Sequence, residues 1–268
     1  MKKVLAVLVV LTLAASMLMA AGTAEKKGIV DKIKASGKLV LGTEATYPPY
    51  EFLDLSTNFQ GCDIWLAQQI AKELGVKLEI VDMSFAGIIP AVQSGQVDIG
   101  IAAFTITSER AQVIDFTEPY EGSDQLLIVK TGNKDLYSTN QSLAGKSVGA
   151  QVGTIQSQLI LDALPDSKLF ELEKYPALAL EVQNGNIAGL VVDEAVGEAL
   201  VANSNGALEV SSYVFDQEIA NFTKAGVIAK GNEDLLALVN SVIKKVVEDG
   251  SYQKAYDEAV ALASKLGL

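Results

Sequence analysis

The chain has 268 residues, of which 49% are hydrophobic and 20% are charged, and its formal net charge is −12. This composition is typical of a globular protein with a large core, and the acidic balance argues against nucleic acid as a partner. The sequence contains no histidine and a single cysteine, Cys62, which excludes Ser-His-Asp and Cys-His catalysis, an internal disulfide and a cysteine-built metal site. We therefore expect no catalytic residue, no cofactor and no bound metal.

The first 24 residues predict export. Residues 1–3 form a basic start, residues 4–19 are apolar, and small residues follow up to Ala24. This pattern is typical of a secretory signal peptide, so we expect a periplasmic protein from which residues 1–24 are removed. The alternative is a retained membrane anchor, but the apolar stretch is slightly short for a membrane span.

After this leader the chain alternates helices and strands, which is the pattern of an α/β protein. Paired prolines predict a stiff loop at 43–52, and polar residues predict turns at 54–61. Helices are expected at 28–35, 62–74, 88–93, 155–163, 176–183, 194–201, 234–248 and 251–266, and strands at 38–42, 76–81, 97–104, 125–130, 146–151, within 168–175, at 210–215 and at 225–229.

A polar cluster follows the buried strand expected at 97–104. It includes Thr105 and Arg110, and Arg110 is expected in a turn. Ligands of open α/β sheets bind beyond the carboxyl ends of the strands, and a guanidinium offers a fork of donors that matches a carboxylate. We therefore hypothesise that this stretch binds a small anion, most simply a carboxylate. The alternative is a surface loop in which Arg110 pairs with Glu109 or Asp115.

The pattern around this strand occurs a second time. AVQSGQVDIGIAAF (91–104) and EVQNGNIAGLVVD (181–193) share the form V-Q-x-G-x-[VI]-x-x-x-[IV], which is typical of a helix end, a glycine cap and a buried strand. The first copy ends near Arg110 and the second ends at Asp193. Two similar α/β units would thus present one cation and one anion, a pair complementary to a zwitterion. Asp193 could also cap the helix that follows, and the two roles are compatible.

Six motifs, taken together and in this order, are specific for one protein family, although each alone is weak. They are GTEATYPPYEF (42–52), GCDIWLAQQIAKELG (61–75), FAGIIPAVQSGQVDIGIAAFTITSER (85–110), DFTEPY (115–120), GKSVGAQVGT (145–154) and DLLALVNSVIKKVVEDGSY (234–252). With them the chain resembles the periplasmic solute-binding proteins of polar amino-acid ABC transporters, the bacterial extracellular solute-binding proteins of family 3.

The resemblance implies two Rossmann-like α/β lobes joined by a two-strand hinge, the type II periplasmic-binding-protein arrangement, with the ligand clamped between the lobes. It implies that lobe 1 comprises residues 25–123 and 225–268, and lobe 2 residues 124–224. It also implies a monomer whose partners are a free L-amino acid and the membrane permease of an ABC transporter. The alternatives are a sensory binding module and a lyase-type enzyme, for which Glu44, Glu121 and Asp193 could supply acid–base groups.

The resemblance also assigns the ligand's head group. Arg110 looks like the arginine that binds the α-carboxylate, beside the hydroxyl of Thr105 and the backbone of Ala103. Asp193 looks like the carboxylate that holds the α-ammonium.

Lobe 2 is expected to close on the same carboxylate through Thr154 and Ile155. Ile155 departs from the threonine that is frequent in the family, so only its backbone N–H, helped by Gln156, would remain for this contact.

The distal end of the ligand is expected to meet Glu44, with Tyr47 and Phe85 as apolar walls. Glu44, together with Glu121, would favour a cationic side chain such as that of arginine or lysine. The alternative is that Glu44 accepts hydrogen bonds from glutamine or another polar neutral amino acid.

Overall fold

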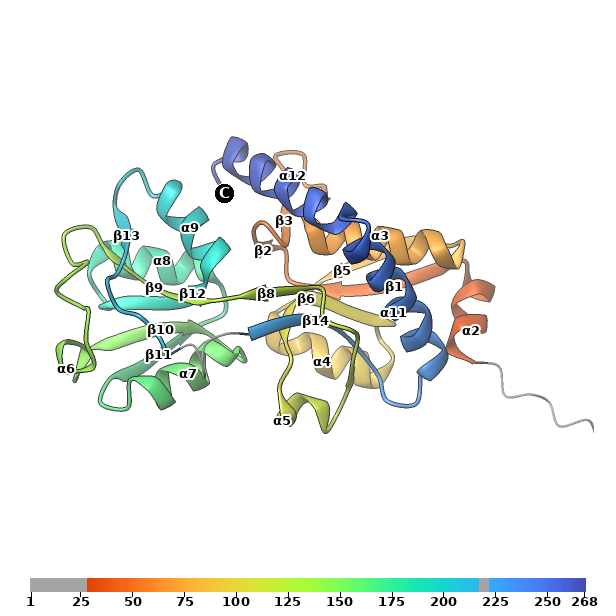
Figure 1. Cartoon of the computed structure of the whole chain (residues 1–268), viewed down its shortest axis with the longest axis horizontal. Coiled ribbons are helices and arrows are strands. Elements are labelled where there is room, and N and C mark those ends of the chain that lie inside the picture. Colours follow the sequence, from red (N-terminus) through yellow and green to blue (C-terminus); the bar gives the residue numbers. More distant parts are fainter. Residues whose placement is uncertain (1–27, 217–221) are drawn as a thin grey trace, which may run out of the picture.

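The computed structural model describes residues 28–216 and 222–268. The predicted signal peptide, residues 1–24, lies outside these ranges. Figure 1 shows two α/β lobes arranged along the long axis of the molecule, with the segment 121–130 running from one lobe to the other. This is the two-lobed α/β fold with a two-strand hinge that the sequence predicts. In the described part of the chain, no helix is both long and apolar enough to cross a membrane.

Lobe 1 is the part of the molecule around a six-stranded sheet. In spatial order the sheet consists of β5 (Lys77–Asp82), β1 (Lys38–Thr43), β6 (Ile99–Thr105), β14 (Phe222–Ile228) and β7 (Asp115–Phe116), with β8 (Glu121–Ser123) paired to β14. The strands β5, β1 and β6 run parallel, and β14 runs antiparallel to β6. Every residue of β6 is buried, as its continuous apolar sequence predicts.

The described helices of this lobe are α2 (Ile29–Ser36), α3 (Cys62–Leu74), α4 (Phe85–Ser94), α5 (Ser108–Ala111), α11 (Glu233–Glu248) and α12 (Ser251–Leu266). The helix α11 buries Leu235, Val239, Val242, Ile243 and Val246, which recur at helical spacing on one face. Gly75 and Gly95 end α3 and α4 in the left-handed conformation, for which glycine pays no Cβ penalty.

Lobe 2 is the part around a five-stranded sheet with the same plan. Its spatial order is β11 (Lys168–Leu172), β10 (Ser147–Gln151), β12 (Gly189–Asp193), β9 (Gln125–Lys130) and β13 (Leu208–Val210). The helices are α6 (Asn140–Leu143), α7 (Ile155–Ala163), α8 (Tyr175–Asn184) and α9 (Glu194–Ala202). β12 is parallel to β10 and antiparallel to β9, just as β6 is parallel to β1 and antiparallel to β14. The repeated sequence pattern therefore reflects a repeated structural unit.

The hinge consists of the segment from β8 into β9 and of β14. Within it β8 and β14 pair antiparallel, with Glu121 opposite Lys224. Lys224 is also opposite Thr105 of β6, so the first residues of β14 already belong to the lobe 1 sheet. The hinge thus brings Lys224 close to the carboxyl end of β6, where the polar cluster begins.

Three local predictions are wrong. The loop and turns expected at 43–61 contain a small three-stranded sheet of β2 (Thr46–Tyr47), β3 (Glu51–Leu53) and β4 (Phe59–Gln60), because the two prolines occupy only the connection between β2 and β3. The strand expected at 210–215 ends at Val210, where Ser211 turns its hydroxyl to the carbonyl of Tyr137. Arg110 lies in the short helix α5 and not in a turn, since Thr107 caps that helix.

Candidate functional site

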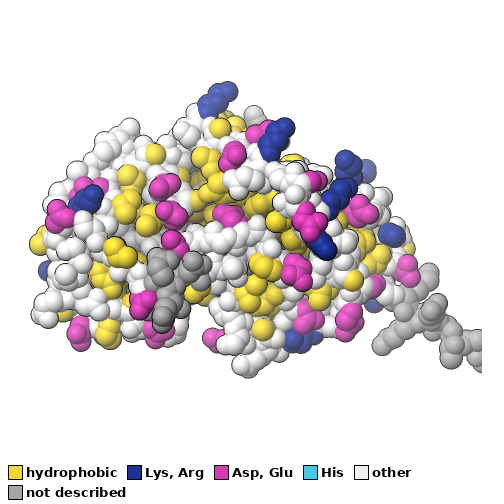
Figure 2. All heavy atoms as spheres, in the orientation of Figure 1, with side chains coloured by type: hydrophobic (Ala, Val, Ile, Leu, Met, Phe, Trp, Pro, Cys, Tyr) yellow, Lys and Arg dark blue, Asp and Glu magenta, His cyan; other side chains and the backbone are white. Residues whose placement is uncertain are grey.

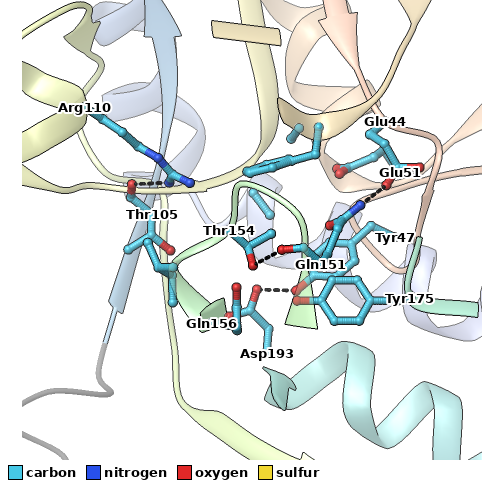
Figure 3. Close-up of a pocket in the computed structure, with 14 residues that line it drawn as sticks. Glu44, Tyr47, Glu51, Thr105, Arg110, Gln151, Thr154, Gln156, Tyr175 and Asp193 are labelled. Atoms are coloured by element: carbon cyan, nitrogen blue, oxygen red, sulfur yellow. Dashed lines mark hydrogen bonds between the residues drawn. The ribbon is translucent and has the colours of Figure 1, made fainter. Parts of the chain in front are cut away.

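A pocket lies between the lobes, where the carboxyl ends of β6, β10 and β12 meet (Figure 3). Every predicted site residue except Glu121 lines it. The lining residues are Glu44, Tyr47, Glu51, Phe85, Ala102, Ala103, Thr105 and Arg110 from lobe 1, and Gln151, Thr154, Ile155, Gln156, Tyr175 and Asp193 from lobe 2.

Arg110 is held at one side of the pocket by backbone carbonyls. Thr107 caps α5 by accepting a 3.1 Å hydrogen bond from the backbone N–H of Arg110, which orients the arginine at the start of the helix. The guanidinium Nη1 donates to the carbonyl of Thr105 at 2.9 Å, and Nη2 donates to the carbonyl of Gly153 in lobe 2 at 3.0 Å. Its carbon lies 5.5 Å from the ring centroid of Phe85, within cation–π range.

The guanidinium of Arg110 forms no ion pair within the part of the chain that the structure describes. Among residues 28–216 and 222–268, no carboxylate lies within ion-pair distance of the guanidinium, and Asp115 pairs instead with Lys230 at 3.1 Å. Burial lowers the pKa of Arg110 to about 10, so the side chain is still a cation at neutral pH. The ion pair that the surface-loop alternative requires, with Glu109 or Asp115, is therefore absent, although the charge of Glu109 opposes the fall in the pKa of Arg110. Arg110 is the only arginine in the sequence.

Asp193, in contrast, already has partners. Tyr47 of lobe 1 donates to its Oδ2 at 2.6 Å, and Gln125 donates to its Oδ1 at 2.6 Å. The Nζ of Lys224 lies 3.2 Å from Oδ2. Gln156 donates in turn to the side-chain carbonyl of Gln125 at 2.8 Å, which fixes the orientation of that amide. Asp193 is held rigidly, with 3% of its surface exposed.

Asp193 also occupies the N-cap position of α9, but its side chain makes no capping hydrogen bond. The side-chain cap considered for Asp193 is therefore absent, and its carboxylate is directed toward the pocket and the hinge.

Two buried glutamates lie across the pocket from Arg110 (Figure 3). Glu44 accepts hydrogen bonds from Thr46 at 2.6 Å and from Gln151 of lobe 2 at 3.3 Å, and Lys174 lies 3.8 Å away. Burial raises the pKa of Glu44. Burial and the neighbouring Asp63 raise the pKa of Glu51 well above its usual range.

Aromatic rings form the apolar part of the pocket wall. The ring centroids of Tyr47 and Tyr175 are 5.2 Å apart, and those of Phe85 and Phe104 are 4.6 Å apart. The Tyr47 pair joins the two lobes, since Tyr47 follows β1 and Tyr175 begins α8. Such rings offer flat surfaces to the aliphatic part of a ligand or to a planar cation.

Ala103 lies at the floor of the pocket with a φ of 48°, a backbone conformation that is uncommon for a residue with a Cβ. Its N–H donates to Asp63 of α3 at 2.8 Å, and this buried carboxylate also accepts from Tyr120 at 2.9 Å. Asp63 therefore holds the strained backbone in place beside the pocket.

The helix α7 of lobe 2 begins at the pocket. Thr154 donates its hydroxyl to the carbonyl of Gln151 at 2.7 Å and makes no capping bond to α7. The first N–H groups of α7, starting at Ile155, have no partner within the helix, and they lie at the end that carries partial positive charge. Gln156 is 3% exposed and is turned toward Gln125.

The lobes touch across the pocket. Gly153 has a φ of 77°, and a Cβ placed there would lie 3.0 Å from the Cβ of Ala86 on α4. The hydrogen bonds from Arg110 to Gly153, from Tyr47 to Asp193 and from Gln151 to Glu44 also cross between the lobes. The structure is therefore a closed arrangement.

The structure does not place Glu121 in the pocket. Its carboxylate accepts from Tyr50 at 2.9 Å and from Tyr252 at 3.1 Å, within the hinge region. Burial raises the pKa of Glu121 to about 7, and Lys224 opposes that rise.

Several lining residues were missed at the level of sequence. Gln151 ends β10 as Thr105 ends β6, so the rule that ligands bind beyond strand ends could have found it. Glu51 and Tyr175 carry no such signal, because they reach the pocket through the small β2–β3–β4 sheet and through the start of α8. Within the described ranges, no group of three or more histidine, cysteine, aspartate or glutamate side chains is placed to hold a metal ion.

Figure 2 shows the surface of one face. Acidic side chains are scattered over both lobes, and lysines lie mainly over lobe 1, so the basic groups on this face form no continuous band across the molecule.

Comparison with known proteins gives a consistent result. The model of the bacterial extracellular solute-binding proteins, family 3, matches residues 39–260. The L-cystine-binding protein TcyJ of Escherichia coli K12 is 32% identical over 228 residues, which cover 85% of this chain and 84% of that protein. The putative ABC transporter arginine-binding protein 2 of the same organism is 30% identical over 224 residues, covering 84% and 91%.

A similar solved structure is that of the amino acid ABC transporter substrate-binding protein AbpA of Streptococcus pneumoniae, bound to L-arginine. It superposes with a TM-score of 0.83 at 33% identity and covers 87% of this chain and 98% of that chain.

Proposed function

The chain belongs to the bacterial extracellular solute-binding proteins, family 3, and we propose that it binds a free L-α-amino acid with a cationic side chain, of the arginine or lysine type, between its two lobes. The observation that carries this proposal is the placement of charge around the pocket. Arg110, a cation that forms no ion pair with any described residue, faces two buried glutamates, Glu44 and Glu51, with Asp193 between the two sides (Figure 3).

The α-carboxylate of the ligand would pair with Arg110. The guanidinium already uses two N–H groups on the carbonyls of Thr105 and Gly153, which fixes its plane and leaves other donors for a carboxylate. The hydroxyl of Thr105, the backbone at Ala103 and Ile155 and the side chains of Thr154 and Gln156 would complete this end. Asp193 would receive the α-ammonium.

The side chain of the ligand would extend toward Glu44. A buried carboxylate with a raised pKa gains most from a cationic neighbour, because the cation restores the charged form that burial disfavours. Tyr47 and Phe85 would cover the aliphatic stem. The arginine-bound relative and the arginine-binding protein of Escherichia coli support this choice of ligand.

Binding would work by closure. A ligand that contacts residues of both lobes favours the closed arrangement by its differential affinity for that state. In this account lobe 1 comprises residues 25–123 and 225–268, lobe 2 comprises residues 124–224, and the hinge lies between them. The closed monomer, exported to the periplasm, would then deliver the amino acid to the membrane permease of an ABC transporter.

A polar neutral amino acid is the second candidate. Glu44 lies within hydrogen-bond distance of Thr46 and Gln151, so it can also serve as an acceptor for an amide. The similarity to an L-cystine-binding protein supports this candidate as well.

We also propose that the bound amino acid is not transformed. The named relatives are binding proteins, and the sequence has no histidine to act as general base. Glu121, a candidate acid–base group, makes its contacts with Tyr50 and Tyr252 in the hinge. Recovery of unchanged ligand after prolonged incubation, monitored by NMR, is the expected result.

Isothermal titration calorimetry against the twenty amino acids and cystine tests the ligand class. The protein should first be unfolded, dialysed and refolded, so that any amino acid carried from the expression host is removed. We expect the tightest binding for arginine or lysine. Tight binding of glutamine or cystine with weak binding of arginine would support the second candidate, and binding of aspartate or glutamate alone would contradict both.

A further inference from the structure

Lys224 is a lysine with no exposed surface, on the hinge strand β14. Its Nζ lies 3.2 Å from Oδ2 of Asp193 and 4.7 Å from the ring centroid of Tyr50. Lys224 does not line the pocket, whereas Asp193 does, so the lysine contacts Asp193 on the side away from the pocket. Lysine is almost never fully buried unless it is paired, and here the pairing partner is the carboxylate expected to hold the ligand's α-ammonium.

Three other acids face the same lysine. Glu51 from β3, Asp63 from α3 and Glu121 from β8 all have pKa values raised by burial, and in each case the charge of Lys224 opposes the rise. The pKa of Asp63 is raised to about 6, and its Oδ2 accepts hydrogen bonds from the N–H of Ala103 and the hydroxyl of Tyr120. Of these four carboxylates, only that of Asp193 lies within ion-pair distance of Nζ. Lys224 is therefore the ion-pair partner of Asp193, and it acts on Glu51, Asp63 and Glu121 only through longer-range electrostatic attraction.

This pairing makes the two charged sides of the pocket unequal. Arg110 forms no ion pair with a described residue, whereas Asp193 already has a cation, the Nζ of Lys224, at 3.2 Å, although that ammonium makes no hydrogen bond among the described residues. A carboxylate that already has a cation attracts a second cation less strongly, and the two cations repel each other. Asp193 also tolerates a ligand without an α-ammonium, because its buried carboxylate still has Lys224 as an ion-pair partner.

We infer that Lys224 is a positioning and specificity-determining residue, which acts through Asp193 to make binding depend weakly on the ligand's α-amino group. The inference rests on the proposed function and adds that the site admits carboxylate ligands without an α-ammonium. Such ligands are ω-guanidino or ω-amino carboxylic acids that still offer a carboxylate to Arg110 and a distal cation to Glu44.

The test compares two probes by calorimetry, L-arginine and 5-guanidinopentanoate, which is arginine without its α-amino group. In the native protein we expect the two dissociation constants to differ by about tenfold or less. In Lys224→Met, Asp193 depends on the ligand for its only cation, so we expect that ratio to rise by about tenfold or more. The change should come mainly from weaker binding of 5-guanidinopentanoate.

Lys230→Met is the matched control. Lys230 lies just after β14 and pairs at the surface with Asp115, and its substitution by methionine removes the same charge as Lys224→Met. We expect its ratio to equal that of the native protein. Lys224→Arg keeps a cation at the hinge and should also keep the native ratio. A purely structural lysine would instead weaken both probes equally in Lys224→Met and leave the ratio unchanged, which would overturn the inference.

Asp193→Asn keeps the test decisive if Lys224→Met does not fold. With Asp193 neutral and Lys224 retained, the lysine repels the α-ammonium, so 5-guanidinopentanoate should bind more tightly than arginine. Adding Lys224→Met to Asp193→Asn should bring the two constants within about threefold of each other. An unchanged preference for arginine in Asp193→Asn would also overturn the inference. Native protein that binds neither probe nor any amino acid would contradict the proposed function itself.

Discussion

The two repeated α/β units end in side chains of opposite charge, and the protein treats these charges differently. The guanidinium of Arg110, beyond β6, donates to two backbone carbonyls and forms no ion pair with a described carboxylate. Asp193, at the end of β12, is surrounded by Tyr47, Gln125 and Lys224. In the proposed function, the same strand-end position thus gives one side that binds an anionic group and another that already has a cation beside it. The pocket is therefore asymmetric in charge between Arg110 and Asp193, although the two units share a topology.

The largest expected effect is at the arginine side. Arg110→Ala should weaken binding of arginine by roughly 100-fold or more, because the ligand carboxylate would be buried without its cation. The melting temperature without ligand should change little, since the guanidinium is desolvated and unpaired in the folded state. Calorimetry and thermal unfolding measure the two quantities.

Arg110→Lys is the control for this variant. It keeps the charge but loses the planar fork, so an intermediate loss of affinity is expected. Wild-type affinity in Arg110→Ala would show that the carboxylate binds elsewhere.

The next effect concerns the far side of the pocket. Glu44→Gln should weaken binding of arginine by about tenfold or more while changing the affinity for glutamine by less, because the lost charge matters only for a cationic side chain. Glu79→Gln, at a half-exposed ion pair with Lys38, is the matched control and should leave both affinities unchanged. Equal losses for arginine and glutamine in Glu44→Gln would favour the neutral ligand.

Closure can be tested with a pair of glycines in lobe 2. Gly153 and Gly145 have similar φ values of 77° and 72°, but only a Cβ at Gly153 would meet lobe 1, at Ala86. Alanine at either position should cost about 1 kcal/mol of stability. Only Gly153→Ala should also weaken ligand binding, by several-fold. If the Gly145→Ala and Gly153→Ala variants bind equally well, the Ala86–Gly153 contact does not limit closure.

The effect farthest from the expected ligand contacts is a pH dependence in the hinge. Burial raises the pKa of Glu121 from the ordinary glutamate pKa of 4.5 to about 7. The unfolded state therefore loses its proton at a lower pH than the folded state, and the free energy of unfolding falls as the pH rises from 4.5 to above 7. Glu121→Gln removes this loss of stability. Its unfolding free energy relative to the native protein should therefore increase by about 2 kcal/mol between pH 5 and pH 8. Glu258→Gln, at an exposed site, should show no such trend.

The sequence predicted the parts of the site that depend on strand ends. The α/β alternation, Arg110, Asp193 and the residues after β6 follow from apolar runs that stop at polar residues, and the repeated pattern paired the two charges. The two-lobed arrangement with its hinge is what the resemblance to the family implies. Family motifs then supplied Glu44, Tyr47 and Phe85, which lie in loops or helix starts.

The counter-ion of Asp193 could not be predicted in the same way. Lys224 precedes the apolar run 225–229, where a lysine is normally expected at the surface. Its burial arises only because β14 pairs with both β6 and β8, far away in the sequence. The position of Glu121 could not be predicted for a similar reason. Its neighbours Tyr50 and Tyr252 come from distant segments that no local pattern connects.

A crystal structure of the protein with L-arginine is the most direct test of the central claim. The account predicts that the α-carboxylate lies on Arg110, the guanidinium lies at Glu44, and the α-ammonium lies beside Asp193 with Lys224 still paired behind it. An arginine bound in the reverse direction, with its guanidinium at Asp193 and its carboxylate away from Arg110, would contradict the account.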